Sequence, residues 1–208
     1  FKVWNILGAA AAQIGEIDQA TLAFKKVIAI KRDNAEAYSN LGNLLKEQGK
    51  LDEAVDAYND ALAIQPDSSE VYNNLGVSLQ AQGKLEEAIE VYNKALIIKP
   101  DNIKVYHNMG VILKDQGKFE EAVEAFKKDG SKLSQNFILK CLYQMDKAEK
   151  FYKQLDYLVD QGENNAVIGS YISRSQIRYG INRNNPFCNQ PLRYTLHTNL
   201  TNHCDFEG

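Results

Sequence analysis

The stretch AEAYSNLGNLLKEQGKLDEAVDAYNDALAIQPDS, residues 35–68, decides the architecture of this chain. Residues 69–102 repeat it as SEVYNNLGVSLQAQGKLEEAIEVYNKALIIKPDN. Residues 1–34 form a looser copy, and residues 103–136 form a copy that decays at its end. Self-similarity at this period is typical of supersecondary units that stack on one another. We therefore expect a solenoid of four units over residues 1–134, because stacked units bury their core between neighbours rather than in one centre.

Four kinds of residue recur at steps of 34 positions: an aromatic residue, a glycine, an alanine and a second aromatic residue. They are Trp4, Tyr38, Tyr72 and Tyr106; Gly8, Gly42, Gly76 and Gly110; Ala20, Ala54, Ala88 and Ala122; and Phe24, Tyr58, Tyr92 and Phe126. Pro66 and Pro100 close two of the units. This pattern resembles the tetratricopeptide repeat (TPR). The resemblance implies an all-α fold, a right-handed α-solenoid of helix hairpins.

Within residues 35–68, the order of helix and turn can be predicted from spacing alone. Tyr38, Leu41 and Leu45 lie on one face of an amphipathic helix predicted over residues 36–48. Gly49 ends this helix, because glycine adopts a left-handed conformation at little cost. A second helix follows and ends before the proline of the unit, which cannot continue a helix.

The glycine inside each first helix requires a separate explanation. Glycine in a helix interior costs about 1 kcal/mol relative to alanine. Close approach of the second helix of the same unit would offset this cost. We therefore assign these glycines to helix packing and give them no role in ligand binding.

The fourth copy loses the pattern near its end. Asp129 stands where the earlier units have valine or alanine, and Ser134 stands where two of them have proline. A buried aspartate without a partner would be costly. The second helix of this unit is therefore predicted to end near Lys128, with Gly130 as its C-terminal cap, and the regular repeats end there.

The remaining residues divide into a helical part and an irregular part. Residues 135–180 are predicted to form capping helices: a hairpin that turns at Asp146 and a third helix over residues 165–179. Residues 181–208 are rich in Asn, Thr and Pro and show no helical stripe. We expect an irregular tail, or a linker to a missing domain, with short extended pieces such as residues 193–196.

Composition and charge exclude several classes of partner. The net charge of −3 gives no basic face for phosphate binding, so no nucleic-acid partner is expected. No apolar run approaches the roughly 20 residues that span a bilayer, so no membrane association is expected. Cys141, Cys188 and Cys204 are odd in number and form no C-x-x-C motif. This favours a reducing compartment, the cytoplasm, over a disulfide framework or zinc site. Phe1 is not Met, and no capping residue precedes the first repeat, so we expect a fragment of a longer protein.

The TPR resemblance also predicts which side chains face the concave groove of the solenoid. Asparagine recurs at the sixth position of three units, and polar residues occupy several of the fifth and ninth positions. The predicted peptide-binding residues are Asn40, Asn74 and Asn108, with Asn5, Asn43, Asn73 and His107. A side-chain amide offers one acceptor and two donors, which complements a peptide group.

Residues 35–54, AEAYSNLGNLLKEQGKLDEA, are especially similar to the superhelical repeats of the nucleocytoplasmic O-linked N-acetylglucosamine transferases. In that family an asparagine ladder on the inner face binds polypeptide. A second interpretation remains open, in which these asparagines bond neighbouring repeats or solvent. Another TPR subgroup clamps a C-terminal carboxylate with lysine and asparagine; the corresponding positions here are Asn5, Ala9, Glu70 and Asn74, so the clamp is absent and chaperone-tail binding is not predicted.

No set of residues indicates catalysis. There is no nucleophile–base pair, glycine-rich phosphate loop or pair of carboxylates, and the H-x-D spacing of His203 and Asp205 lacks the second histidine of an iron site. Residues 150–180 and 185–198 are similar to the segment after the repeats in some marine bacterial TPR proteins. In those proteins a domain assigned as a 2-oxoglutarate/iron(II) oxygenase follows.

We therefore predict a protein-interaction scaffold that binds an extended peptide or partner protein in its groove, with no enzymatic activity, catalytic residue, metal or cofactor of its own. The alternative is the substrate-recognition and linker region of a larger enzyme, an oxygenase or a glycosyltransferase, whose C-terminal catalytic domain lies outside this sequence.

Overall fold

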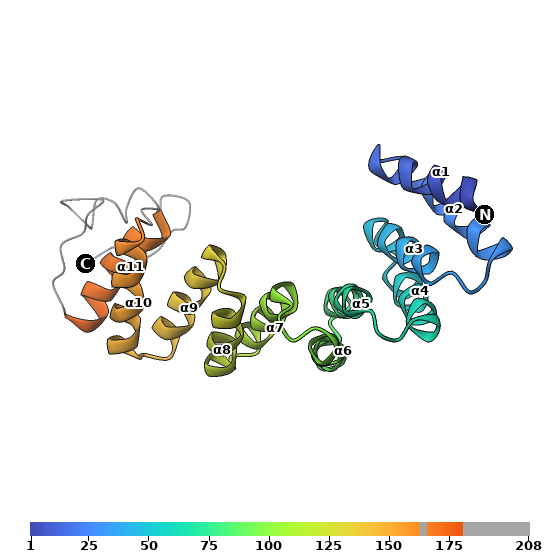
Figure 1. Cartoon of the computed structure of the whole chain (residues 1–208). Coiled ribbons are helices and arrows are strands. Elements are labelled where there is room, and N and C mark those ends of the chain that lie inside the picture. Colours follow the sequence, from blue (N-terminus) through green and yellow to red (C-terminus); the bar gives the residue numbers. More distant parts are fainter. Residues whose placement is uncertain (163–165, 181–208) are drawn as a thin grey trace. The chain divides into compact units, whose positions relative to one another are not determined.

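A computed structural model of the chain describes residues 1–162 and 166–180 (Figure 1). Eleven helices and no strand occur in these residues, which confirms the predicted all-α class. The helices are α1 (Lys2–Gln13), α2 (Ile17–Ile30), α3 (Ala35–Glu47), α4 (Leu51–Ile64), α5 (Ser69–Ala81), α6 (Leu85–Ile98), α7 (Ile103–Asp115), α8 (Phe119–Asp129), α9 (Lys132–Gln144), α10 (Ala148–Asp160) and α11 (Ala166–Tyr179). The predicted irregular tail over residues 181–208, with its extended pieces at 193–196, lies outside the described residues.

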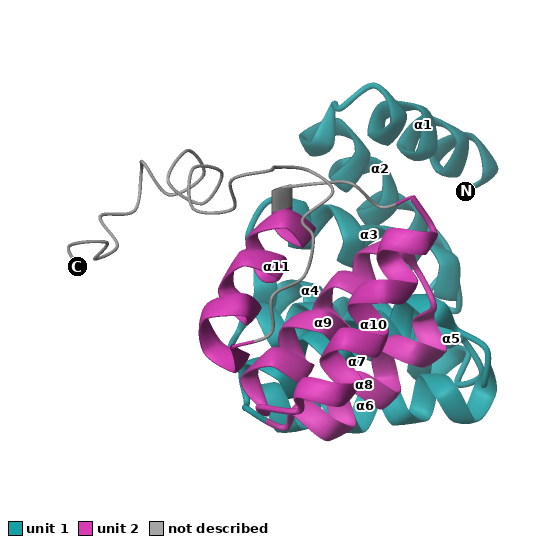
Figure 2. Ribbon diagram, turned by 90° about the vertical axis from the view of Figure 1, so that its left-hand side faces the viewer, with its two compact units in different colours: residues 1–117 teal, residues 118–208 magenta. Residues whose placement is uncertain are grey.

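The chain divides into two compact units, residues 1–117 and 118–208, which are described separately (Figure 2). In the first unit α1 packs on α2, α3 on α4, and α5 on α6, and successive hairpins also contact each other. The predicted turns are present: Gly49 and its counterparts one repeat before and after have positive φ. The domain boundary that we expect near residue 134 stays a prediction.

The glycine inside each first helix makes room for an aromatic ring of the second helix. A Cβ atom on Gly42 would lie 2.7 Å from Cε1 of Tyr58, and one on Gly76 would lie 2.4 Å from Cε1 of Tyr92. Both rings are fully buried. The predicted close approach of the paired helices is thus confirmed at these two positions.

The second unit begins with the helix whose end the broken pattern predicts. α8 ends at Asp129, and Gly130 follows it with φ 66°, which confirms the predicted cap. The Asp129 carboxylate accepts hydrogen bonds from the hydroxyls of Ser131 and Ser134. Ser134, which replaces the usual proline, therefore supplies a partner for the aspartate that replaces the usual alanine.

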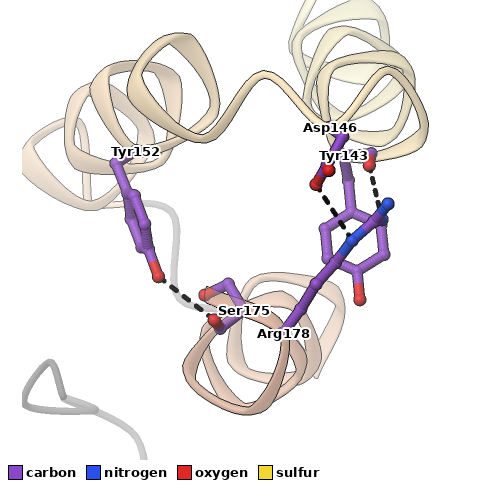
Figure 3. Close-up of polar contacts among 5 residues, drawn as sticks. All are labelled: Tyr143, Asp146, Tyr152, Ser175 and Arg178. Carbon is purple, nitrogen blue, oxygen red and sulfur yellow. Dashed lines mark hydrogen bonds and ion pairs between the residues drawn. The ribbon is translucent and has the colours of Figure 1, made fainter. Parts of the chain in front are cut away.

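α11 is held against the turn between α9 and α10 by polar contacts (Figure 3). Arg178 donates to the carbonyl oxygen of Tyr143 at 2.7 Å and pairs with Asp146 at 3.1 Å. Its guanidinium also lies 4.6 Å from the centre of the Tyr143 ring. Tyr152 on α10 donates to the carbonyl oxygen of Ser175 at 3.2 Å. Asp146 has φ 58° and forms the predicted turn.

None of the helices in the described part of the chain has the length and apolar character needed to cross a membrane.

Candidate peptide-binding site

The residues predicted to bind peptide all lie on the first helices of their repeats, within the first unit. Asn5 is on α1, Asn40 and Asn43 are on α3, Asn73 and Asn74 are on α5, and His107 and Asn108 are on α7. This placement follows from the 34-residue period, because equal positions in successive units fall on equivalent helices.

Hydrogen bonds join these side chains from α3 to α5. Asn74 Nδ2 donates to Asn43 Oδ1 at 3.2 Å. The same oxygen accepts from the Tyr58 hydroxyl at 2.7 Å. Burial, followed by the negative charge of Glu47, raises the pKa of Tyr58, so its hydroxyl remains a donor to Asn43. Both lone pairs of the Asn43 oxygen are therefore occupied.

The network continues from α5 to α7. Asn73 Nδ2 donates to Asn74 Oδ1 at 3.3 Å, and Asn108 Nδ2 donates to Asn73 Oδ1 at 3.0 Å. Only 9% of Asn73 is exposed. Asn74 and Asn108 thus bond neighbouring repeats, as in the interpretation that gives these asparagines a structural role. These bonds occupy some of the donors and acceptors that a bound peptide would otherwise use.

Asn40 differs from the other asparagines of the ladder. Its side chain makes no hydrogen bond within the described residues, and it is partly exposed. It lies between two hollows, of about 210 Å³ and about 310 Å³, and lines both. Asn43 also lines both hollows, and its amide nitrogen makes no hydrogen bond in the described structure. On α3, Asn40 therefore has both of its amide atoms unused among the described residues, and Asn43 has its amide nitrogen unused.

The walls of these two hollows carry negative charge. Glu36 and Glu70 line the smaller hollow, and Glu47 lines the larger one. Neither hollow has a lysine or arginine among its lining residues. Sequence reasoning missed these carboxylates. Glu36 and Glu70 are 34 residues apart and hold the same repeat position, which could have revealed them, whereas the proximity of Glu47 to the asparagines arises only on folding.

The other two predicted residues do not join this arrangement. Asn5 lies on α1, and its side-chain oxygen is buried without a hydrogen bond among the described residues. His107 lies on α7 and lines neither hollow. No cluster of His, Cys, Asp and Glu in residues 1–162 and 166–180 is arranged to hold a metal ion. His203 and Asp205 lie outside the described residues.

Sequence reasoning also missed a second ladder, made by the glutamines that follow α3, α5 and α7. Gln48 donates to Asp18 at 3.0 Å, Gln82 to Asp52 at 2.8 Å, and Gln116 to Glu86 at 3.2 Å. Each bond joins one repeat to the preceding one. The 34-residue step between the three glutamines could have revealed them, since an acidic residue stands at one position of each preceding unit.

Comparison with known proteins agrees with this arrangement. The family model described as TPR repeat matches residues 8–49, 42–83 and 78–117, which together cover more than half of the chain. The chain therefore belongs to the TPR repeat family. No curated protein sequence matches it significantly.

Solved structures of other TPR proteins are similar in fold. A crystal structure of MamA has a TM-score of 0.59 and 29% identity, covering 72% of this chain and 80% of that one. PilF of Pseudomonas aeruginosa has a TM-score of 0.75 and 21% identity, covering 97% and 91%. A tetratricopeptide repeat protein of Parabacteroides merdae has a TM-score of 0.75 and 16% identity, covering 96% and 78%. The structures of PilF and of the Parabacteroides merdae protein, at 21% and 16% identity, show only that the fold is shared. The repeats and the likeness to MamA support a protein-interaction scaffold as the general class.

Proposed function

We propose that the first unit binds an extended, basic segment of a partner protein across α3, with Asn40 and Asn43 bonded to its backbone. The observation that carries this proposal is the Asn40 amide, which lies between two hollows and makes no hydrogen bond in the described structure. A peptide group has one donor and one acceptor, and an asparagine side chain can meet both.

The hydrogen-bonding state of the ladder supports α3 as the centre of the site. The oxygen of Asn43 is occupied by Tyr58 and Asn74, so its amide nitrogen is held in place and remains available to donate. A preorganised donor loses little side-chain entropy on binding. Asn74 and Asn108 position this arrangement through the network rather than binding the peptide with their full amides.

The charge of the hollows supports a basic ligand. Glu36 and Glu47 lie on α3 and Glu70 lies on α5, and no cation among the lining residues neutralises them. Lysine or arginine side chains of a ligand would do so, and complementary charge increases the association rate and excludes acidic competitors. A C-terminal carboxylate, by contrast, would be repelled.

The proposal can be tested with peptides selected from a random library displayed on phage, using the immobilised chain as bait. We expect the selected sequences to be enriched in Lys and Arg. Their affinities are then measured by fluorescence anisotropy for the wild-type chain, Asn40→Ala and Asn59→Ala. Asn59 is a matched control because it is exposed on α4 of the same repeat and lines neither hollow.

Asn40→Ala should weaken binding about tenfold, since two hydrogen bonds to a peptide group contribute about 1.4 kcal/mol between them. Asn59→Ala should leave the affinity unchanged. The triple change of Asn40, Asn74 and Asn108 to Ala should weaken binding by tenfold or more. Equal affinity of Asn40→Ala and wild type, with unchanged circular dichroism, would exclude α3 as the binding site.

A further inference from the structure

The second unit has a hollow of its own, of about 560 Å³, formed by α8, α9 and α10. α9 packs against both other helices (Figure 2). Ile138 and Leu142 of α9, with Met145 at its C-terminal cap, form the apolar floor of the hollow. Val123 of α8 and Tyr157 of α10 extend this floor on either side. The volume is within the range of ligand sites, about 300 to 1,000 Å³.

One edge of this hollow is a row of lysines. Lys147, Lys150 and Lys153 line it from the start of α10 onwards, and all three are exposed. None of them makes a hydrogen bond or ion pair with the described residues. We call the hollow with this row the lysine-edged groove. The three lysines are spaced three residues apart and extend over about 9 Å of the helix axis, at 1.5 Å per residue.

The opposite edge, on α8, does not cancel this charge. Lys127 pairs with Glu124 at 2.7 Å, so these two residues neutralise each other. Glu120 is the remaining acidic residue of the lining. Four lysines against two glutamates leave the lining with a net charge of +2. The pKa of Glu124 is lowered mainly by Lys127, with a smaller contribution from Lys150 across the groove.

We propose that the lysine-edged groove binds an acidic segment of a partner protein, with a large apolar side chain on the α9 floor and several carboxylates along α10. The row of cations favours a segment with several carboxylates, because a single anionic headgroup would engage one lysine and leave the others unpaired. The apolar floor accounts for the apolar anchor, since removal of such a side chain from water drives binding.

This site is separate from the proposed site on α3. Its lining residues all belong to the second unit, and its charge is opposite in sign. The two proposals can therefore fail independently. The first requires a basic extended ligand and Asn40, whereas the second requires an acidic ligand and the lysines of α10.

The test uses the full chain and a blocked, fluorescein-labelled peptide of Glu and Leu, with the same peptide carrying Gln in place of Glu as its neutral counterpart. Binding is measured by anisotropy. The test variant changes Lys147, Lys150 and Lys153 to Gln. The matched control changes Lys84, Lys94 and Lys99 to Gln, which removes the same charge from exposed positions of α6 and its ends. Lys84 also precedes its helix as Lys147 precedes α10.

We expect saturable binding of the acidic peptide, at least tenfold weaker binding of the neutral one, and at least a tenfold loss in the α10 triple variant. The α6 control should bind within about twofold of wild type, since none of its three lysines lines the groove. Tyr157→Ser should also weaken binding without unfolding the chain, because this tyrosine is half exposed. Asn40→Ala should bind the acidic peptide as wild type does.

Three results would overturn the proposal. The first is no saturable binding of the acidic peptide up to about 1 mM. The second is an equal loss in the α10 and α6 variants, which would indicate unspecific attraction. The third is saturable binding of monomeric dodecanoate, or self-association of the chain abolished by Tyr157→Ser, without peptide binding. That result would assign the groove to a lipid or to a second copy.

Discussion

Replacement of Gly76 by alanine tests the packing on which the repeat depends. A Cβ atom at this position would lie 2.4 Å from Cε1 of Tyr92 and 2.7 Å from two further ring atoms. Tyr92 is fully buried, so other side chains of the core enclose its ring and have to shift before the ring can move. Gly8, the equivalent position of the first repeat, gives a matched comparison, because a Cβ there would lie 3.1 Å from the Phe24 ring.

The two substitutions should differ in their effect on stability. Alanine is favoured over glycine in a helix by about 1 kcal/mol, and insertion of a methyl group into a packed core costs about 1 to 3 kcal/mol. At Gly76 the severe overlap places the cost at the upper end, so we expect a net loss of about 2 kcal/mol. At Gly8 a shift of a few tenths of an ångström relieves the contact, so the change should stay within about 0.5 kcal/mol.

Urea unfolding followed by far-ultraviolet circular dichroism measures both changes. Fluorescence of Trp4, the single tryptophan, reports the first repeat separately, which matters because solenoids need not unfold in one step. Gly76→Ala should also cost less in a Tyr92→Leu background, since the ring that it meets is gone. Equal midpoints for Gly76→Ala and Gly8→Ala, or no coupling to Tyr92, would refute the packing argument.

Three other predictions concern pH, the glutamine ladder and the docking of α11. Burial raises the pKa of Tyr92, opposed by a hydrogen bond from Asn108, so the folded state holds this proton above the unperturbed value of about 10. Stability should then fall as pH rises beyond about 10, and Tyr92→Phe should lessen the fall in urea midpoint; an unchanged pH profile would contradict this. Gln82→Glu should lower the midpoint at neutral pH by placing a second carboxylate beside Asp52, and recovery in high salt checks the cause. Arg178→Ala should speed amide hydrogen exchange in α11, whereas unchanged exchange would show that its contacts to the α9–α10 turn are dispensable.

The sequence predicts the fold almost completely because each TPR repeat is held together by contacts between residues close in sequence. Gly76 and Tyr92 belong to one repeat, and their spacing recurs in every copy. The close packing of the paired helices and the bounds of each hairpin could therefore be inferred from the 34-residue period. The broken copy was informative for the same reason. Asp129 in place of alanine predicted the end of α8, and only its hydroxyl partners had to be found in the structure.

The candidate sites could be predicted only in part. The sequence by itself determined that the asparagines share the first helices, because position in the period decides the helix on which a residue lies. Only the tertiary structure decided that Asn74 and Asn108 bond neighbouring repeats while Asn40 does not. The tertiary structure also placed Lys147, Lys150 and Lys153 beside the apolar residues of α9 that line the lysine-edged groove. Hydrogen bonds between repeats depend on ångström-scale distances between helices, whereas a repeating pattern records only which residues belong to each helix.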